Sequence, residues 1–180
     1  MKKNKYLIIS ISVLVIGFIS CQKKRIHIPD ISTKDMNGNI QILVSTPSQN
    51  KTFIAFDSVS QQFIKTEKKY SLNSIANTGY IAGKKALHQA IVLGETSKTG
   101  SIVSTTPIAL ARLKTEKHTI DWHVYADVNS NITNFEDFVL NHRELKNKLQ
   151  HKFEIPDGTL KSKLIWYDED YLEWKINKAL

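Results

Sequence analysis

The sequence predicts an α+β fold in which a small β-barrel precedes two helices. Between residues 40 and 125, short runs rich in β-branched and aromatic residues are separated by turn residues, as in a series of short strands. After residue 134, the apolar residues change to the spacing of helices. Strands that come first and helices that come last are typical of α+β domains, and many short strands favour a closed or partly open barrel.

The predicted strands begin at Ile40. The runs Ile40–Thr46 and Thr52–Phe56 flank a turn-prone stretch at residues 47–50, and we expect a hairpin there. Four further runs continue the series, with Gly94 and Gly100 as breaks. They are Ala90–Leu93, Ser101–Thr105, Pro107–Leu113 and Ile120–Tyr125.

Two helices are predicted near the C-terminus. Asn134 is a suitable N-cap, and the apolar residues from Phe135 to Phe153 recur at helical spacing before the turn at residues 156–158. A last strand, Lys163–Trp166, leads to a second helix capped near Asp168. The apolar side of that helix carries Tyr171, Leu172 and Ile176.

The first 20 residues have the three parts of an export signal. Lysines at positions 2, 3 and 5 precede an uncharged apolar stretch from Tyr6 to Ile19, and the small residue Ser20 stands before Cys21. This stretch is shorter than the roughly 20 residues that a helix needs to span a bilayer. We therefore expect residues 1–20 to be a lipoprotein signal peptide.

Cys21 is predicted to be the lipid-bearing first residue of the mature protein. Residues 18–21, Phe-Ile-Ser-Cys, resemble a bacterial lipobox, with Phe18 where Leu is usual. Cys21 is also the only cysteine in the chain, so no intramolecular disulfide is possible. Acylation, for example with palmitate, explains an unpaired thiol in an exported protein. Residues 21–39 then form a lipidated tether, and residues 40–180 form the folded domain.

The net charge of the mature chain and the lipid on Cys21 indicate which partners to expect. Removal of residues 1–20 takes away three lysines and leaves a net charge of +5, which favours anionic membranes or cell-wall polymers. The chain has three arginines, and this scarcity argues against a nucleic-acid partner.

We expect the protein in the bacterial envelope, held by the lipid on Cys21. No acidic residue follows Cys21 directly, so our expected location is the outer membrane, facing the periplasm.

Several segments, taken in order, resemble the soluble inorganic pyrophosphatases of the family I type. Gly100–Leu113, GSIVSTTPIALARL, is similar to the family's GSVVxVRPIGVLxL. Ser74–Ile81 is similar to YPxNYGFI, and Gln89–Leu93 to the DVLVL that ends the family's acidic motif. His151–Glu154 resembles HFFE, and Trp166–Leu180 resembles the family's last helix. The resemblance covers residues 40–180 and implies a five-stranded, OB-like barrel flanked by two C-terminal helices.

The resemblance implies a catalytic site that this chain has largely lost. The family's DxDPxD loop, whose carboxylates hold Mg²⁺, corresponds to Lys84–Gln89, which contains no acidic residue. Asp121 is the one retained candidate for a catalytic and metal-binding carboxylate, with Glu116 as a nearby second metal ligand. A site for several Mg²⁺ ions needs several converging carboxylates. We therefore expect a pseudoenzyme without a bound cofactor.

The same positions suggest a different ligand. Lys84, Lys85 and His88 stand where the family has carboxylates, so the sign of the implied site is reversed. With Asn77 and Tyr80 of the neighbouring motif, they are the candidate residues for binding a small anion. The first interpretation is thus an envelope lipoprotein with an inactive pyrophosphatase-like domain, acting by anion or ligand binding or by assembly.

Two alternatives stay open. The first is an active, Mg²⁺-dependent inorganic diphosphatase with a rearranged site, which would need Asp121, Glu116 and further acids. The second is a structural accessory lipoprotein that presents the barrel to an envelope protein and leaves the old pocket unused.

Overall fold

The computed structural model confirms the predicted α+β fold. It describes residues 32–50, 53–57, 62–66, 74–81, 89–114, 119–154 and 163–179. The strands are β1 (Ile40–Thr46), β2 (Phe53–Asp57), β3 (Gln62–Thr66), β4 (Asn77–Ile81), β5 (Gln89–Leu93), β6 (Ile102–Lys114), β7 (Thr119–Asp127) and β8 (Lys163–Tyr167). The helices are α2 (Phe135–Leu140), α3 (Arg143–Glu154) and α4 (Glu169–Ala179).

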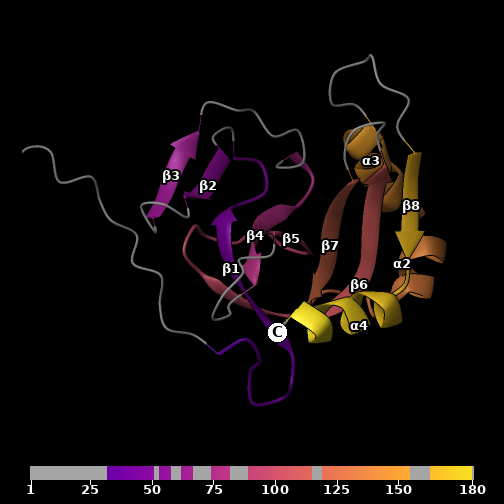
Figure 1. Cartoon of the computed structure of the whole chain (residues 1–180), viewed down its shortest axis with the longest axis horizontal. Coiled ribbons are helices and arrows are strands. Elements are labelled where there is room, and N and C mark those ends of the chain that lie inside the picture. The colour runs from indigo at the N-terminus through magenta and orange to yellow at the C-terminus, as the bar shows by residue number, and fades with distance from the viewer. Residues whose placement is uncertain are drawn as a thin grey trace, which may run out of the picture.

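Five of the described strands pair in a ring. The order β1-β4-β5-β7-β6 returns to β1 through an additional β1–β6 pairing, and β8 extends the sheet beside β6. The β5–β7 pair is parallel, whereas the other pairs are antiparallel. This agrees with the five-stranded, OB-like barrel that the resemblance implies. The two-stranded β2–β3 sheet lies on the side of the ring away from β8 and α3 (Figure 1).

The strands of the ring bury both of their faces, because side chains alternate between the two sides of a strand. Residues such as Ile42, Val92 and Tyr125 form an inner core. Residues such as Ile91 and Val124, on the opposite face, form an outer core. Both cores consist mainly of apolar side chains that are fully or almost fully buried.

The helices cover the barrel at two different places. Phe138 of α2 and Leu149 and Phe153 of α3 complete the outer core. Leu172 and Ile176 of α4 instead reach the inner core, so α4 lies across one end of the barrel (Figure 1). The predicted caps are correct: the Asn134 side chain accepts a hydrogen bond from Asp137 N, and the Asp168 side chain accepts one from Tyr171 N.

Two strand predictions are wrong in detail. β1 pairs with β4 and β6, and β2 pairs with β3. β1 and β2 therefore do not form the expected hairpin with each other. The runs on either side of Pro107 belong to the single strand β6. Pro107 lies where the register with β7 shifts, and such a bulge accommodates a residue that has no backbone N–H.

The expected long helix is two helices. The backbone N–H groups of Asn141 and His142 both donate to the carbonyl of Asp137, which closes α2 before α3 begins at Arg143. The apolar spacing continues across this break because both helices cover the same outer core. Spacing alone therefore does not reveal the interruption.

Among the described residues, no helix is long and apolar enough to cross a membrane.

Gly79 of β4 provides a test of the barrel packing. A Cβ at this position would lie 2.4 Å from the Leu43 carbonyl oxygen and 2.9 Å from Ile42 Cγ2, so backbone would have to move. We expect Gly79→Ala to lower the free energy of unfolding by about 3 kcal/mol or more, measured by urea denaturation. Gly100→Ala is the control. It has a positive φ of 83° but open space around the Cβ, and we expect it to cost about 1 kcal/mol. Equal losses in the two variants would contradict this packing.

Candidate functional site

Asp121, which the resemblance implies as a catalytic and metal-binding carboxylate, is held by two cationic side chains. It stands on β7 directly opposite Arg112 on β6. The guanidinium donates from Nε to Oδ1 at 2.7 Å and from Nη2 to Oδ2 at 2.9 Å, which is a bidentate pair. Lys175 of α4 donates to Oδ2 as well. Both carboxylate oxygens are therefore bonded within the protein.

Two tyrosines hold the guanidinium of Arg112 in place. Its carbon lies 5.3 Å from the ring centroid of Tyr167 and 5.8 Å from that of Tyr171. The two rings stack on each other, with their centroids 4.4 Å apart. Nη1 of Arg112 also donates to the Tyr171 hydroxyl at 3.4 Å. These contacts keep a planar cation oriented for its bidentate pair.

We call Arg112, Asp121, Tyr171 and Lys175 the mouth cluster, because they lie where α4 crosses the end of the barrel. Arg112 comes two residues after Leu110 on β6, and Asp121 comes two residues before His123 on β7. Leu110 and His123 are buried, so all four residues are on the inner side of their strands. On α4, Tyr171 and Lys175 are one turn apart and adjacent to the core residues of the helix. The cluster thus links two strands to the last helix.

Partial burial gives these charges more effect than they would have at an open surface. The side chains of Arg112, Asp121 and Lys175 are 19%, 18% and 29% exposed. Burial and the neighbouring guanidinium of Arg112 lower the pKa of Lys175. The Asp121 carboxylate acts in the opposite direction, because it stabilises the ammonium form. Two cations around one carboxylate leave the cluster with a net positive charge.

The residues present at the mouth cluster do not fit a Mg²⁺ site. Magnesium prefers near-octahedral oxygen coordination, and several carboxylates are needed to bring several ions together. Here the cations Arg112 and Lys175 lie against the Asp121 carboxylate, where a pyrophosphatase would need other acids. Within the described part of the chain, no three His, Cys, Asp or Glu side chains are grouped so that they could hold a metal.

Asn77, a candidate for ligand binding, is buried in contacts with two loops. Its Oδ1 accepts from Ser48 N at 2.8 Å and from Ser97 N at 3.1 Å, and its Nδ2 donates to the Glu95 carbonyl at 2.7 Å. Asn77 pairs with Val92, which in turn pairs with Tyr125. Asn77 therefore lies near the opposite end of the barrel strands from Asp121.

Along the strands, Tyr80 lies closer than Asn77 to the position of Asp121, but its side chain is on the other face of the sheet. It pairs with Leu43 and Gln89, and it alternates with Gly79 and Ile81 of the inner side. The structure thus brings neither Asn77 nor Tyr80 to the mouth cluster. The candidates Lys84, Lys85, His88, Glu116 and Cys21 lie outside the described residues.

The cations that bind Asp121, Arg112 and Lys175, are not among the site residues predicted from the sequence. A signal for Arg112 is its place in an otherwise apolar, alternating strand, opposite a second charged residue if β6 and β7 pair. A signal for Lys175 is its position beside Ile176, on the apolar side of a helix. Neither signal identifies the partner, because the contact depends on how α4 packs on the barrel.

Comparisons with known proteins identify the fold. No family model and no curated relative matches the sequence. Solved structures of inorganic pyrophosphatases do match. The enzyme from Thermus thermophilus has a TM-score of 0.67 at 14% identity, over 83% of this chain and 94% of the other. The pyrophosphatase from Helicobacter pylori has a TM-score of 0.63 at 12% identity, over 84% and 96%.

A vacuolar soluble pyrophosphatase from Trypanosoma brucei is a further match, with a TM-score of 0.65 at 14% identity, covering 87% of this chain and half of that one. These structures cover most of the present chain. The chain therefore has the fold of the inorganic pyrophosphatases, as the sequence resemblance implies. At these identities the comparison establishes the fold and not the activity.

Asp121→Asn tests whether the mouth cluster stabilises the domain. The variant leaves Arg112 and Lys175 facing each other without a carboxylate, so we expect a loss of about 2 kcal/mol or more in urea denaturation. Adding Lys175→Met removes one of the cations while keeping an apolar stem, and we expect it to recover part of this loss. Glu173→Gln, an exposed change on the same helix, is the control and should shift stability by less than about 0.5 kcal/mol. A double variant no more stable than Asp121→Asn alone would contradict the predicted repulsion.

Proposed function

We propose that this protein is an envelope lipoprotein whose pyrophosphatase-like domain does not hydrolyse diphosphate and acts by binding an anionic ligand or an envelope partner. The structural similarity to inorganic pyrophosphatases supports a pyrophosphatase-like domain. The Cys21 motif supports export and acylation. The proposal that the domain is inactive rests on the chemistry around Asp121.

The observation that carries the proposal is the pairing of Asp121 with Arg112 and Lys175. Hydrolysis of diphosphate by several metal ions requires carboxylates that neutralise the ions and stabilise the charge of the transition state. A loss of even a few kcal/mol of that stabilisation removes about two orders of magnitude in rate. In this domain, the single carboxylate neutralises protein cations instead.

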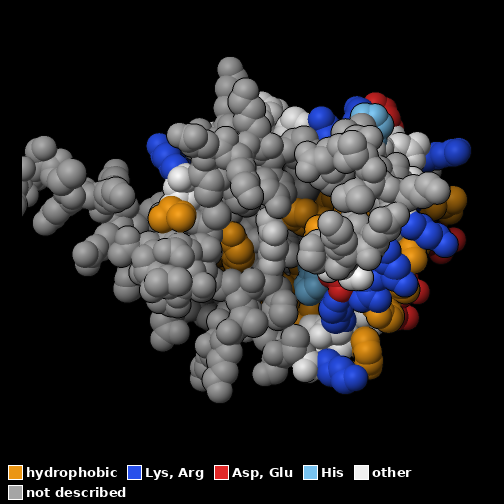
Figure 2. Space-filling model, turned by 45° about the horizontal axis from the view of Figure 1, so that its top comes forward, with side chains coloured by type: hydrophobic (Ala, Val, Ile, Leu, Met, Phe, Trp, Pro, Cys, Tyr) orange, Lys and Arg blue, Asp and Glu red, His pale blue; other side chains and the backbone are white. Residues whose placement is uncertain are grey.

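Basic residues favour an anionic ligand or partner. The segment that corresponds to the family's acidic motif contains Lys84, Lys85 and His88, and the chain without residues 1–20 has a formal net charge of +5. Lys and Arg side chains gather on the half of the described surface that carries the helices (Figure 2). Such a surface attracts anions over distances of about a Debye length, roughly 10 Å at 0.1 M salt.

A phosphate-release assay tests the absence of hydrolysis. The full chain, kept in detergent, is incubated with diphosphate and Mg²⁺, Mn²⁺, Zn²⁺ or Co²⁺. We expect no phosphate above the blank without enzyme, because Asp121 is paired with Arg112 and Lys175 and the described residues contain no group of three metal-ligating side chains. Asp121→Asn and Asp127→Asn are measured in parallel. Release that Asp121→Asn abolishes and Asp127→Asn retains would instead establish an active diphosphatase.

Metabolic labelling tests the anchor. Cells that produce the full chain are grown with labelled palmitate, and we expect label in the protein and the protein in the membrane fraction. Cys21→Ser removes the acceptor thiol, so the label should be lost. Val15→Thr, a change within the apolar stretch that keeps Cys21, is the control and should retain it. Equal labelling of the wild type and of Cys21→Ser would contradict acylation at this residue.

A further inference from the structure

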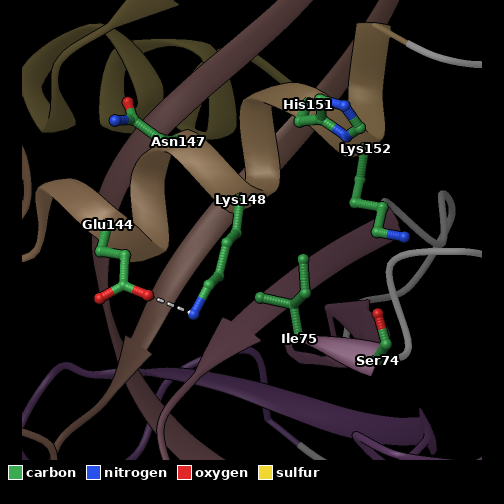
Figure 3. Close-up of a pocket in the computed structure, with 7 residues that line it drawn as sticks. All are labelled: Ser74, Ile75, Glu144, Asn147, Lys148, His151 and Lys152. Atoms are coloured by element: carbon green, nitrogen blue, oxygen red, sulfur yellow. Dashed lines mark ion pairs between the residues drawn. The ribbon is translucent and has the colours of Figure 1, made fainter.

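A pocket lies between α3 and the start of β4, away from the mouth cluster. Its volume is about 560 Å³, within the range of roughly 300–1,000 Å³ found for small-molecule sites. Two segments about 70 residues apart form it, as Figure 3 shows. The lining residues are Ser74, Ile75, Glu144, Asn147, Lys148, His151 and Lys152.

Basic side chains dominate the charge of this pocket. Lys148 and Lys152 are one helical turn apart, and both extend from α3 toward the Ser74–Ile75 segment (Figure 3). His151 lies next to them on the last turn of the helix. Glu144 is the one acidic residue of the lining, so two lysines face one carboxylate. The pocket therefore favours an anion.

The existing ion pair in the pocket is easily exchanged. Lys148 Nζ lies 2.6 Å from Glu144 Oε1, but the two side chains are 59% and 82% exposed. An exposed i,i+4 pair of this kind contributes little to stability. No described acidic residue forms an ion pair with Lys152. A ligand that carries two negative charges can thus engage both ammonium groups with little to displace.

The walls of the pocket are held by the outer core. Leu149 and Phe153, on the other side of α3, are buried in this core, and Ile75 packs against it. Trp122 and Phe153 also contact each other, with ring centroids 5.5 Å apart. The backbone positions that carry the pocket side chains are consequently set by packing and do not require a ligand to form.

The pocket is independent of the former catalytic position. The outer core, which α3 covers, lies on one face of the β6–β7 sheet, with Ala111 and Trp122. Arg112 and Asp121 alternate with these residues and lie on the opposite face, beneath α4. A ligand in the α3 pocket would therefore contact neither the Asp121 carboxylate nor its cations.

We propose that this α3 pocket binds a phosphorylated small molecule, with the phosphate between Lys148 and Lys152 and the organic part against Ile75. A dianionic phosphate matches two ammonium groups spaced by one turn. The pocket is much larger than a phosphate ion, and it offers an apolar surface at Ile75 and polar groups at Ser74 and Asn147. A phosphate ester of a compact, hydroxyl-bearing molecule such as a sugar matches the charged, apolar and polar parts of this lining.

Calorimetric titration of the full chain in detergent at low salt tests this site. The probes are glucose 6-phosphate, inorganic phosphate and glucose. We expect glucose 6-phosphate to bind more tightly than inorganic phosphate and glucose to give no heat. Lys148→Gln and Lys152→Gln should each weaken glucose 6-phosphate by about tenfold, because each removes one charged hydrogen bond. Thermal denaturation of both variants confirms that they are folded.

Two control variants make the result specific. Lys146 lies on the same helix but places its ammonium over the Trp166 ring, 5.4 Å from the centroid, and Lys146→Gln should change the affinity less than twofold. The pair Lys84→Gln and Lys85→Gln should leave it unchanged. Absence of heat with glucose 6-phosphate, equal affinity for inorganic phosphate, or an equal effect of Lys146→Gln would overturn the proposal. Loss of binding only with the Lys84 and Lys85 changes would place the ligand at the segment that corresponds to the acidic motif, which supports the proposed function but overturns this inference.

Discussion

Strand β6 is the constraint on which the rest of the domain depends, because it pairs with three neighbours. Its first residues, Ile102–Thr105, pair with β1 and so complete the ring of strands. Its last residues, Leu110–Lys114, lie between β7 and β8. A straight strand could not pair with β1 at one end and lie between β7 and β8 at the other. The register shift at Pro107 bends β6 between these two parts. The position of α4 follows, since β8 leads directly into that helix.

The mouth cluster balances the charge of its carboxylate with cations from the protein itself. In a site with many carboxylates and no cations, the acids would repel one another. Here Arg112 and Lys175 supply positive charge from the protein itself, and the Tyr167 and Tyr171 rings cover the guanidinium. The same contacts attach α4 to the end of the barrel.

Local patterns predicted much of this fold, but not the contacts that close it. β1, β5, β7, β8 and α4 agree with their predicted runs to within a few residues, because each has apolar residues at a regular spacing. β4 is indicated only by its resemblance to YPxNYGFI, because Asn77 and Gly79 are weak strand formers. The pairing of β1 with β6 joins residues about 60 positions apart, and no local signal reports it.

The candidate site was harder to predict, for a related reason. Asp121 was identified as a single residue by its place in a motif, whereas its chemistry depends on partners nine and 54 residues away. With carboxylates nearby it would be a metal ligand, but with Arg112 and Lys175 it is an anchor for a helix. Asn77 shows the same effect, since its three hydrogen bonds to loop backbone account for the residue without any ligand.

The two faces of the barrel wall separate stability from binding. The residues on the inner face form the inner core and the mouth cluster. A ligand that bound there would have to displace the partly buried ion pairs of Asp121. On the outer face, α3 is held by its apolar side and presents its lysines to a pocket, where an exposed ion pair is the main competing interaction. Because a weak surface pair is much easier to exchange than a partly buried network, the outer face is where this fold can take up an anion without loosening its last helix.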